Sequence, residues 1–291
     1  MKFRPNPVLR LLRRILRSID HNGVRGAAVN AFRLLIRSIK AYAVRGTLDN
    51  ASAYAMPTAA PSDLICDQIH PFDKQYGTDT GGRISSGDMA AVSLSALHAA
   101  GYVGIPPSSL RPALAALPLK HEDFTFIDIG CGKGRAALIA SEFPFRRIIG
   151  VELAMEMARI AHTNVSLKPS WEERISIVNE DALSFELPDD PIVLFLYHPF
   201  TTMLLRRFLS KLGRQLRRSP RPTFIIDADA YSGKVEKVFT DTPRCRAAMA
   251  SFPFLHEVCD LVFPLSEEDM ATEPTGCTMN RFTVFSVDVT G

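Results

Sequence analysis

Three glycines in one short turn, Gly130, Gly132 and Gly134, form the pattern of this sequence that most directly indicates chemistry. They follow an apolar run at residues 124–129, of the kind that a buried parallel strand shows, and they precede an expected helix at residues 136–143. Glycines let a ligand approach the main chain where a Cβ would clash, and the start of a helix offers free N–H groups. A strand, a glycine turn and a helix in this order predict a nucleotide-binding site.

The spacing of the glycines leaves two classes of nucleotide open. The dinucleotide fingerprint G-x-G-x-x-G/A, read from the first glycine, needs a small residue where Arg135 stands, but it fits when read through Gly132, Gly134 and Ala137. An NAD(P)-linked oxidoreductase is therefore one hypothesis. Asp128, near the end of the strand, favours another ligand, because its carboxylate would repel a pyrophosphate and attract the cationic end of S-adenosylmethionine.

Two further acids follow the next expected strands, and an aromatic segment follows the one after. Glu152 ends the strand expected at residues 147–152, Asp181 follows the strand expected at 175–178, and LFLYHPF occupies residues 194–200. Together with DIGCGKGR at residues 128–135, these segments resemble the motifs of the class I (Rossmann-like) S-adenosylmethionine-dependent methyltransferases. The resemblance implies a methyltransferase with S-adenosyl-L-methionine as its cofactor.

The resemblance also assigns expected cofactor contacts. In that family the acid after the second strand binds the ribose hydroxyls, which matches Glu152, and the acid after the third strand contacts the adenine amine, which matches Asp181. The other expected contacts are Asp128, Gly130, Cys131, Gly132, Gly134 and Tyr197. Cys131 is expected to fill space in the turn rather than to act as a nucleophile.

The segment at residues 69–86 is rich in glycine and threonine, which predicts a loop without a regular helix. Tyr76, Thr78 and Thr80 lie in a stretch that resembles the Y-G-x-T loop of the non-SET histone lysine methyltransferases. In that family the loop lines the methionine end of the cofactor. These three residues are therefore expected cofactor contacts, and a plain connector is the alternative.

The stretch Tyr197-His198-Pro199-Phe200 is expected nearest to the chemistry. It resembles the (D/N)-P-P-(Y/F) tetrad of amino-group methyltransferases, but Tyr197 replaces the acid or amide and His198 replaces the first proline. Phe200 can form a wall for the acceptor or stabilise a cation on its face. His198 can accept a proton near neutral pH or can be a structural residue. His198, Tyr197 and Phe200 are the candidate catalytic residues, and two acids that end the fifth expected strand, at positions 227 and 229, can also face the acceptor.

Helices are expected at residues 87–100 and 108–117, the second capped by Ser108 or Ser109. Strands and helices then alternate regularly from residue 124 to residue 228, which predicts a parallel sheet with right-handed crossovers. Two strands expected near 254–263 and 281–289 fit an antiparallel pair that closes the sheet. The predicted fold class is α/β: a doubly wound, mostly parallel seven-stranded sheet, the strand number being implied by the resemblance, with an N-terminal basic helical extension.

Residues 1–46 carry 11 lysines and arginines and one acid, Asp20, which leaves a net charge of −7 on the rest of a chain whose total is +3. Helical periodicity at residues 7–19 and 24–44 predicts two basic amphipathic helices. We therefore divide the chain into an extension and linker at 1–62 and a cofactor-binding domain at 63–291. The extension either packs its apolar face on the domain or on a second subunit, or binds an anionic membrane surface or an acidic partner. Nucleic acid is disfavoured because aromatic residues for base stacking are missing.

The five cysteines form no C-x-x-C pair and no cluster with histidine, so no metal site is expected. No apolar run is long enough for a membrane span, and arginines interrupt every apolar run near the start. These features favour a cytoplasmic protein, with peripheral attachment to a membrane left open. The leading hypothesis is in-line methyl transfer to an acceptor that is a protein amine or a small molecule. The alternatives are the NAD(P)-linked enzyme and a degenerate methyltransferase fold that serves as a membrane-associated binding protein.

Overall fold

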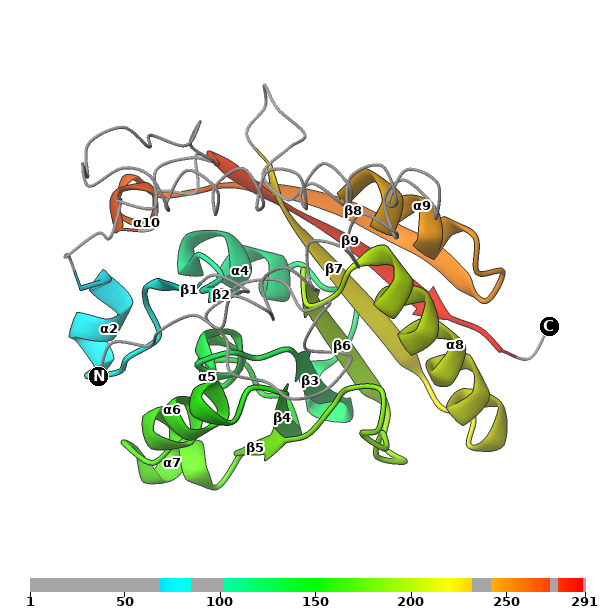
Figure 1. Cartoon of the computed structure of the whole chain (residues 1–291), viewed down its shortest axis with the longest axis horizontal. Helices are drawn as coiled ribbons and strands as arrows, with labels where there is room; N and C mark the ends of the chain where they lie inside the picture. The colour runs from blue at the N-terminus through cyan, green and yellow to red at the C-terminus, as the bar shows by residue number, and fades with distance from the viewer. Residues whose placement is uncertain (1–68, 85–101, 232–241, 273–276, 290–291) are drawn as a thin grey trace, which may run out of the picture.

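The computed structural model describes residues 69–84, 102–231, 242–272 and 277–289. Its centre is a seven-stranded sheet in the order β5-β4-β3-β6-β7-β9-β8 (Figure 1). The strands are β3 (Thr125–Ile129), β4 (Arg147–Glu152), β5 (Ile175–Asn179), β6 (Ile192–Tyr197), β7 (Thr223–Tyr231), β8 (Leu255–Pro264) and β9 (Met279–Val287). A separate antiparallel pair joins β1 (Arg83–Ile84) to β2 (Tyr102–Val103). The predicted α/β fold class with its mostly parallel sheet of seven strands is confirmed.

The strand order reverses between β3 and β6. The chain runs outward from β3 to β4 and β5, then returns to pair β6 with the other side of β3 and continues to β7, all in parallel. β9 pairs antiparallel with β7, and β8 pairs antiparallel with β9. In open α/β sheets, such a reversal leaves a crevice at the carboxyl ends of the strands. The fold therefore places a binding crevice where β3, β4 and β6 end.

Helices cover both faces of the sheet because neighbouring residues of the central strands point to opposite faces. On β3, Phe126 packs into a core with α4 (Pro107–Ala115) and α5 (Arg135–Ala140), whereas Ile127 packs into a core with α8 (Thr202–Arg218) and α9 (Thr242–Ala250). The remaining helices are α2 (Pro71–Tyr76), η1 (His121–Asp123), α6 (Met155–Val165), α7 (Pro169–Glu172) and α10 (Glu267–Thr272). Burial on both faces explains why these strands read as continuous apolar runs.

Two local predictions are wrong. Residues 69–86 were expected to lack a regular helix, yet α2 forms there, because the Nδ1 atom of His70 accepts a hydrogen bond from the N–H of Phe72 and Gly77 ends the helix in the left-handed region. α4 was expected to be capped by Ser108 or Ser109. It begins one residue earlier, after Pro106, and the hydroxyl of Ser109 instead donates to the carbonyl of Pro106.

Several expectations fall outside the described residues. The two basic helices at 7–19 and 24–44, the linker that follows them and a helix expected at 87–100 all lie there. The division into an extension and a domain therefore stays a prediction. Within the described ranges, no helix is long and apolar enough to cross a bilayer.

A buried polar cluster ties the beginning of the described chain to its end. Asp269 of α10 lies 3.0 Å from the Nε2 atom of His70, which precedes α2, and accepts a hydrogen bond of 3.0 Å from the N–H of Ser108 in α4. Burial raises the pKa of the Asp269 carboxyl, but the hydrogen bonds from His70 and Ser108 outweigh burial, so its pKa is lowered overall. The charged form of Asp269 is therefore stabilised in the folded protein.

We expect Asp269→Asn to reduce the free energy of unfolding at pH 7 by about 1–3 kcal/mol, because it removes charged hydrogen bonds in a buried site. A carboxyl whose pKa is lowered by folding contributes stability above its unfolded pKa of about 3.9 and loses it as the pH falls through the folded pKa. Urea unfolding at pH 7 and pH 3 should therefore show a difference between wild type and variant that shrinks at the lower pH. Glu156→Gln, which removes an exposed ion pair to Arg159, is the matched control and should have little effect. If Asp269→Asn lowers the free energy of unfolding equally at both pH values, the stabilisation of the charged form of Asp269 is contradicted.

Candidate functional site

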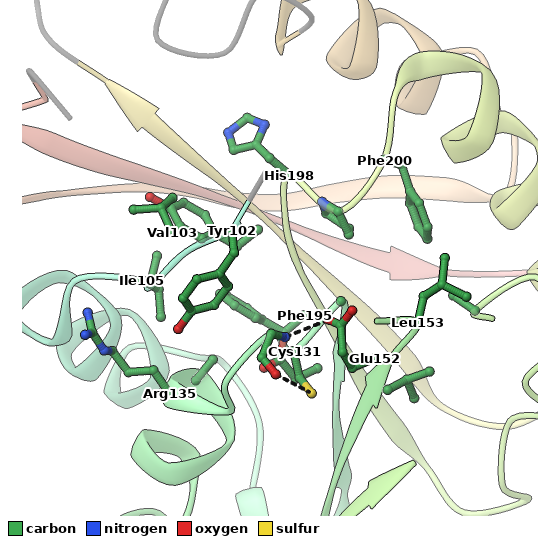
Figure 2. A pocket seen from close by; sticks show the side chains of 18 of the residues that line it. Tyr102, Val103, Ile105, Cys131, Arg135, Glu152, Leu153, Phe195, His198 and Phe200 are labelled. Atoms are coloured by element: carbon green, nitrogen blue, oxygen red, sulfur yellow. Dashed lines mark hydrogen bonds between the residues drawn. The ribbon is translucent and has the colours of Figure 1, made fainter. Parts of the chain in front are cut away.

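A pocket opens at the carboxyl ends of β3, β4 and β6 (Figure 2). Its walls are the glycine turn after β3, the end of β4, the turn after β5, the aromatic segment after β6 and, on the other side, β2 and the residues that follow it. The expected site residues that line it are Asp128, Gly130, Cys131, Gly132, Glu152, Asp181, Tyr197, His198 and Phe200. The topology thus gathers residues that are up to 72 positions apart in the sequence into one crevice.

The glycine turn requires its glycines. Gly130, Gly132 and Gly134 have φ values of +76°, +54° and +90°, a region that side-chain-bearing residues rarely adopt. A Cβ on Gly130 would lie 2.8 Å from the Cβ of Pro199, and a Cβ on Gly132 would lie 2.1 Å from the ring of Tyr102. Gly130 and Gly132 line the pocket, whereas Gly134 stands at the N-cap of α5 and is not part of the pocket wall.

Cys131 fills space within the turn, as expected. Its side chain is buried, and a Cβ on Gly150 of the neighbouring strand would lie 2.8 Å from its Sγ atom. Burial raises the pKa of the Cys131 thiol, and the acids Asp128 and Glu152 raise it further. Because the thiolate is the reactive form, Cys131 is a poor nucleophile.

Asp128 places a carboxyl group in the wall of the pocket although the residue is only 3% exposed. Burial, and secondly the nearby charge of Glu152, raises the pKa of Asp128 to about 8. Within the described chain, no basic side chain forms an ion pair with it. A positive charge in the pocket would therefore be attracted to this group and would lower its pKa.

Glu152 connects the end of β4 to the glycine turn. Its Oε2 atom accepts a hydrogen bond of 2.8 Å from the N–H of Gly132 (Figure 2). Its Oε1 atom accepts one of 2.7 Å from the N–H of Ala154. Burial raises the pKa of Glu152, while these main-chain hydrogen bonds act in the opposite direction. Each carboxylate oxygen has a second lone pair, so Glu152 can still accept hydrogen bonds from ligand hydroxyls.

Asp181 lies in the turn after β5, at the edge of the pocket. Its Oδ1 atom accepts a hydrogen bond of 2.9 Å from the N–H of Leu183, and the side chain is half-buried. Glu180 lines the pocket beside it. The third expected acid is thus in place, but solvent screens it more than the two acids on the neighbouring strands.

Tyr197 and Phe200, together with Pro199, form the aromatic part of the pocket wall. Phe200 packs its ring at 5.2 Å from that of Phe208 in α8, which fixes its orientation. Figure 2 shows Phe200 beside Leu153, on the side of the pocket where Glu152 lies. This wall is apolar and can accommodate the uncharged part of an acceptor.

His198 adopts an unusual backbone conformation and points its ring away from Glu152 (Figure 2). Its φ of +51° is the only positive value at a non-glycine residue in the described chain. Its Nε2 atom lies 3.0 Å from Oδ1 of Asp229, and Oδ2 of the same aspartate lies 3.2 Å from Arg246 of α9. Asp227, two residues earlier on β7, has its pKa raised to about 8, by burial first and by Asp229 second. Of the two expected acids of β7, Asp229 therefore contacts His198, and neither acid lines the pocket.

Tyr76, Thr78 and Thr80 do not line the pocket. The hydroxyls of Thr78 and Thr80 each donate a hydrogen bond of 2.6 Å to Oδ1 of Asp73. The hydroxyl of Tyr76 lies 3.4 Å from a carboxylate oxygen of Glu142, its hydrogen-bond acceptor. Their contact with a cofactor stays a prediction. Their hydroxyl groups form hydrogen bonds with Asp73 and Glu142, which do not line the pocket.

The sequence analysis missed β2 and the residues after it as part of the site. Tyr102, Val103 and Ile105 line the pocket, and the hydroxyl of Tyr102 donates a hydrogen bond of 2.6 Å to the carbonyl of Thr80. Leu153 also lines it. Leu153 could have been found from the sequence, because it is an apolar residue directly after the strand-end acid. β2 could not, because a two-residue strand is too short to show an alternation of apolar and polar residues.

The chemistry of the pocket fits a cation with hydroxyl groups. Two buried carboxyls without basic partners in the described chain form its floor, and a turn of glycines with positive φ exposes main chain beside them. Arg135 lies in the wall, but its Nε atom donates to Thr80 and its guanidinium lies on the far side of Tyr102 from Glu152 (Figure 2). These residues suit a sulfonium-bearing nucleoside and would repel a pyrophosphate. Within the described residues, no group of His, Cys, Asp and Glu could hold a metal ion.

Comparison with known proteins agrees with this chemistry. Residues 126–219 match the family model described as a methyltransferase domain. A protein from Oryza sativa subsp. indica named "Probable histone-arginine methyltransferase CARM1" is 28% identical over 145 residues, which is 49% of this chain and 25% of that protein. A "Probable histone-arginine methyltransferase 1.3" from Arabidopsis thaliana is 26% identical over 144 residues, covering 48% of this chain and 24% of the relative. The chain thus spans about a quarter of the length of these curated relatives.

The solved structures that this chain resembles have low sequence identity to it. A SAM-dependent methyltransferase from Aquifex aeolicus matches with a TM-score of 0.43 and 14% identity, over 62% of this chain and 92% of that one. Magnesium protoporphyrin IX methyltransferase from Synechocystis PCC 6803, solved with bound SAM, matches with a TM-score of 0.39 and 12% identity, over 61% of this chain and 74% of that one.

We expect S-adenosylmethionine to displace a proton from Asp128 when it binds at pH 7. The pKa of Asp128 is about 8 in the free protein, so its carboxyl is mostly protonated, and a bound cation would lower that pKa. Calorimetric titrations in two buffers of different ionisation enthalpy should show release of up to about one proton per site, and affinity should increase as the pH rises toward 8. Asp128→Asn should abolish the release and weaken binding.

Asp227→Asn is the matched control, because Asp227 also has a pKa of about 8 but does not line the pocket. This variant should release protons as wild type does. If wild type binds S-adenosylmethionine without releasing a proton, the placement of Asp128 against the ligand is contradicted. The same holds if Asp227→Asn abolishes the proton release.

Proposed function

We propose that this chain, whose residues 126–219 match the family model described as a methyltransferase domain, transfers a methyl group from S-adenosylmethionine to an amine of a protein acceptor. The observation that carries the proposal is the pair of acids that forms the floor of the pocket. Asp128 and Glu152 are buried at the ends of adjacent strands, and neither forms an ion pair with a basic group of the described chain. A cationic nucleoside is the ligand that such a floor favours.

The cofactor would be held by the acids and by the main chain of the turn. Asp128 would face its positively charged part, Glu152 would accept hydrogen bonds from the ribose hydroxyls, and Asp181 would accept one from the adenine amine. Gly130 and Gly132 would allow the ligand to approach the main chain. The same floor disfavours the NAD(P)-linked alternative, since a pyrophosphate carries negative charge.

S-adenosylmethionine supplies, when bound, a methyl group on a sulfonium that is already a good leaving group. The protein therefore has to orient the acceptor and remove its proton. Tyr197 and Phe200 form the apolar wall that would position the acceptor. Similarity to the two plant proteins named as histone-arginine methyltransferases favours a protein nitrogen as the atom that receives the methyl group.

His198 is the candidate group for taking up the proton. Its imidazole lies against Asp229, whose charge would stabilise the protonated ring, and Arg246 holds the aspartate from the other side. This order, a base oriented by a buried acid, is a recurrent arrangement in catalysis. The acceptor would reach the ring from the mouth of the pocket, since the ring points away from Glu152.

The acceptor class can be tested by labelling. Lysate from a strain that lacks this protein, incubated with the purified full chain and S-adenosylmethionine labelled in the methyl group, should become labelled in the protein fraction. Glu152→Ala should abolish labelling, because the carboxylate that holds the ribose is lost. Label confined to the small-molecule fraction would contradict a protein acceptor, and saturable binding of NADH without binding of S-adenosylhomocysteine would overturn the cofactor assignment.

A base role for His198 predicts a loss of turnover without a loss of cofactor affinity. We expect His198→Ala to lower kcat by about 10²- to 10⁴-fold, the usual contribution of general acid–base catalysis. Its affinity for S-adenosylhomocysteine, measured by calorimetry, should change by less than about threefold. His198→Asn serves as a milder variant that also tolerates a positive φ. A kcat within threefold of wild type in both variants would show that His198 is structural.

A further inference from the structure

The helix that follows the aromatic segment carries a large local excess of positive charge. α8 contains six basic residues and no acid in 17 positions, in a chain whose residues after position 46 have a net charge of −7. Its apolar residues are buried against the sheet, so the basic residues occupy the outer face. Figure 1 shows α8 in the outer layer of helices, beside α9.

Four of these side chains follow one face of the helix. Arg207, Lys211, Arg214 and Arg218 are spaced i, i+4, i+7 and i+11, which places them in a stripe about 16 Å long. Three of the four, all but Lys211, are exposed. The positive charges of the stripe therefore lie along a line on one face of α8 and are not scattered over the surface of the helix.

The stripe borders a groove that begins close to the pocket. The groove is lined by Leu183, Arg206, Arg207, Ser210, Lys211 and Arg214. Leu204, in the first turn of the same helix, lines the pocket itself, and Leu183 follows the pocket residues Asp181 and Ala182 directly. A ligand lying in the groove would thus extend away from the mouth of the site.

The charge of the stripe is largely uncompensated. Arg207, Arg214 and Arg218 make no ion pair or hydrogen bond with any residue in the described ranges. Lys211 is the exception: it donates a hydrogen bond to the carbonyl of Phe185 and lies 3.9 Å from Glu186, while burial lowers its pKa. Three guanidinium groups in a row therefore remain available for an anionic partner, and arginine suits carboxylates because it binds them in bidentate fashion.

We propose that this groove, the α8 groove, binds an acidic, extended segment of a protein partner. The stripe is narrow, since Glu186 and Asp189 lie along its edge, bound to Gln215 and Ser219 of the helix and its cap. An extended peptide spans about 3.3 Å per residue, so about five residues cover the stripe. This inference goes beyond methyl transfer and does not depend on it.

Other anionic partners fit the surface less well. No aromatic side chain lines the groove, so it offers no platform for the stacking of unpaired bases. The acids along the edge would repel the second strand of a duplex. Stable binding to a membrane surface usually adds inserted apolar side chains to charge attraction, and the apolar side chains of α8 are buried in the core.

The proposal can be tested with the full chain and a fluorescein-labelled peptide of six Glu-Ser repeats, using fluorescence anisotropy at 50 mM and 200 mM salt. The combined variant Arg207→Glu, Arg214→Glu, Arg218→Glu should weaken binding by at least tenfold. Wild-type binding should weaken with salt, as expected for contacts between exposed charges. A control variant makes the same change of charge at three exposed positions elsewhere: Lys120→Glu, Arg146→Glu and Arg159→Glu. Its affinity for the peptide should stay within threefold of wild type.

Affinity for S-adenosylhomocysteine, measured on the same variants, should be unchanged, which shows that each is folded and separates this proposal from the cofactor assignment. A third variant, Arg10→Glu, Arg13→Glu, Arg17→Glu, reverses charge in the basic N-terminal extension. If the α8 variant and the control variant lose peptide affinity equally, the proposal is overturned. It is also overturned if only the N-terminal variant loses peptide affinity. The proposal would also be overturned if wild type bound a 12-nucleotide DNA, or vesicles with anionic lipid, more tightly than the peptide, and the α8 variant lost that binding.

Discussion

The placement of two carboxyl groups beside a turn whose glycines leave the main chain uncovered determines the rest of the site. An uncompensated buried charge is costly, and a protein usually pairs it or lets it become neutral. Glu152 receives two main-chain hydrogen bonds, whereas Asp128 has its pKa raised to about 8. The floor of the pocket therefore lacks a compensating positive charge, which a bound cation would supply, and that cation would favour the charged form of Asp128.

Two basic residues at the end of the turn have polar partners other than the acids of the floor, and this leaves those acids without a compensating cation. Arg135, only 1% exposed, donates to Thr80, while Lys133 lies 2.5 Å from Asp79 and donates to the carbonyl of Gly81. The side chain of Asn164 donates to the carbonyls of both Asp79 and Lys133, which joins the segment after α2 to the turn. That segment therefore supports the turn, and it provides the polar partners of both cations.

The central parallel strands and the acids at their ends could be predicted from the sequence, because buried parallel strands give continuous apolar runs and their carboxyl ends meet at one edge of the sheet. Asp128, Glu152 and Asp181 thus lie where the motifs indicate. The role of residues 69–86 could not be predicted in this way. The cap that His70 gives to α2 and the network around Asp73 depend on contacts with residues far along the chain, such as Arg135 and Asp269. Composition alone indicated a loop, and tertiary contacts stabilise a helix there instead.

The turn from β6 into α8 links two surfaces of opposite charge. His198 reverses the chain with a positive φ, Phe200 packs on Phe208, and α8 begins at Thr202, so the wall of the pocket and the basic stripe are fixed by the same short segment. Exposed charges are screened beyond about 8 Å at physiological salt, whereas buried charges are screened much less. The arginines of α8 therefore act on ligands at the surface without neutralising the acids of the floor. A site that attracts a cation inside and an acidic chain outside can hold both ligands at once, because each meets a field of the opposite sign.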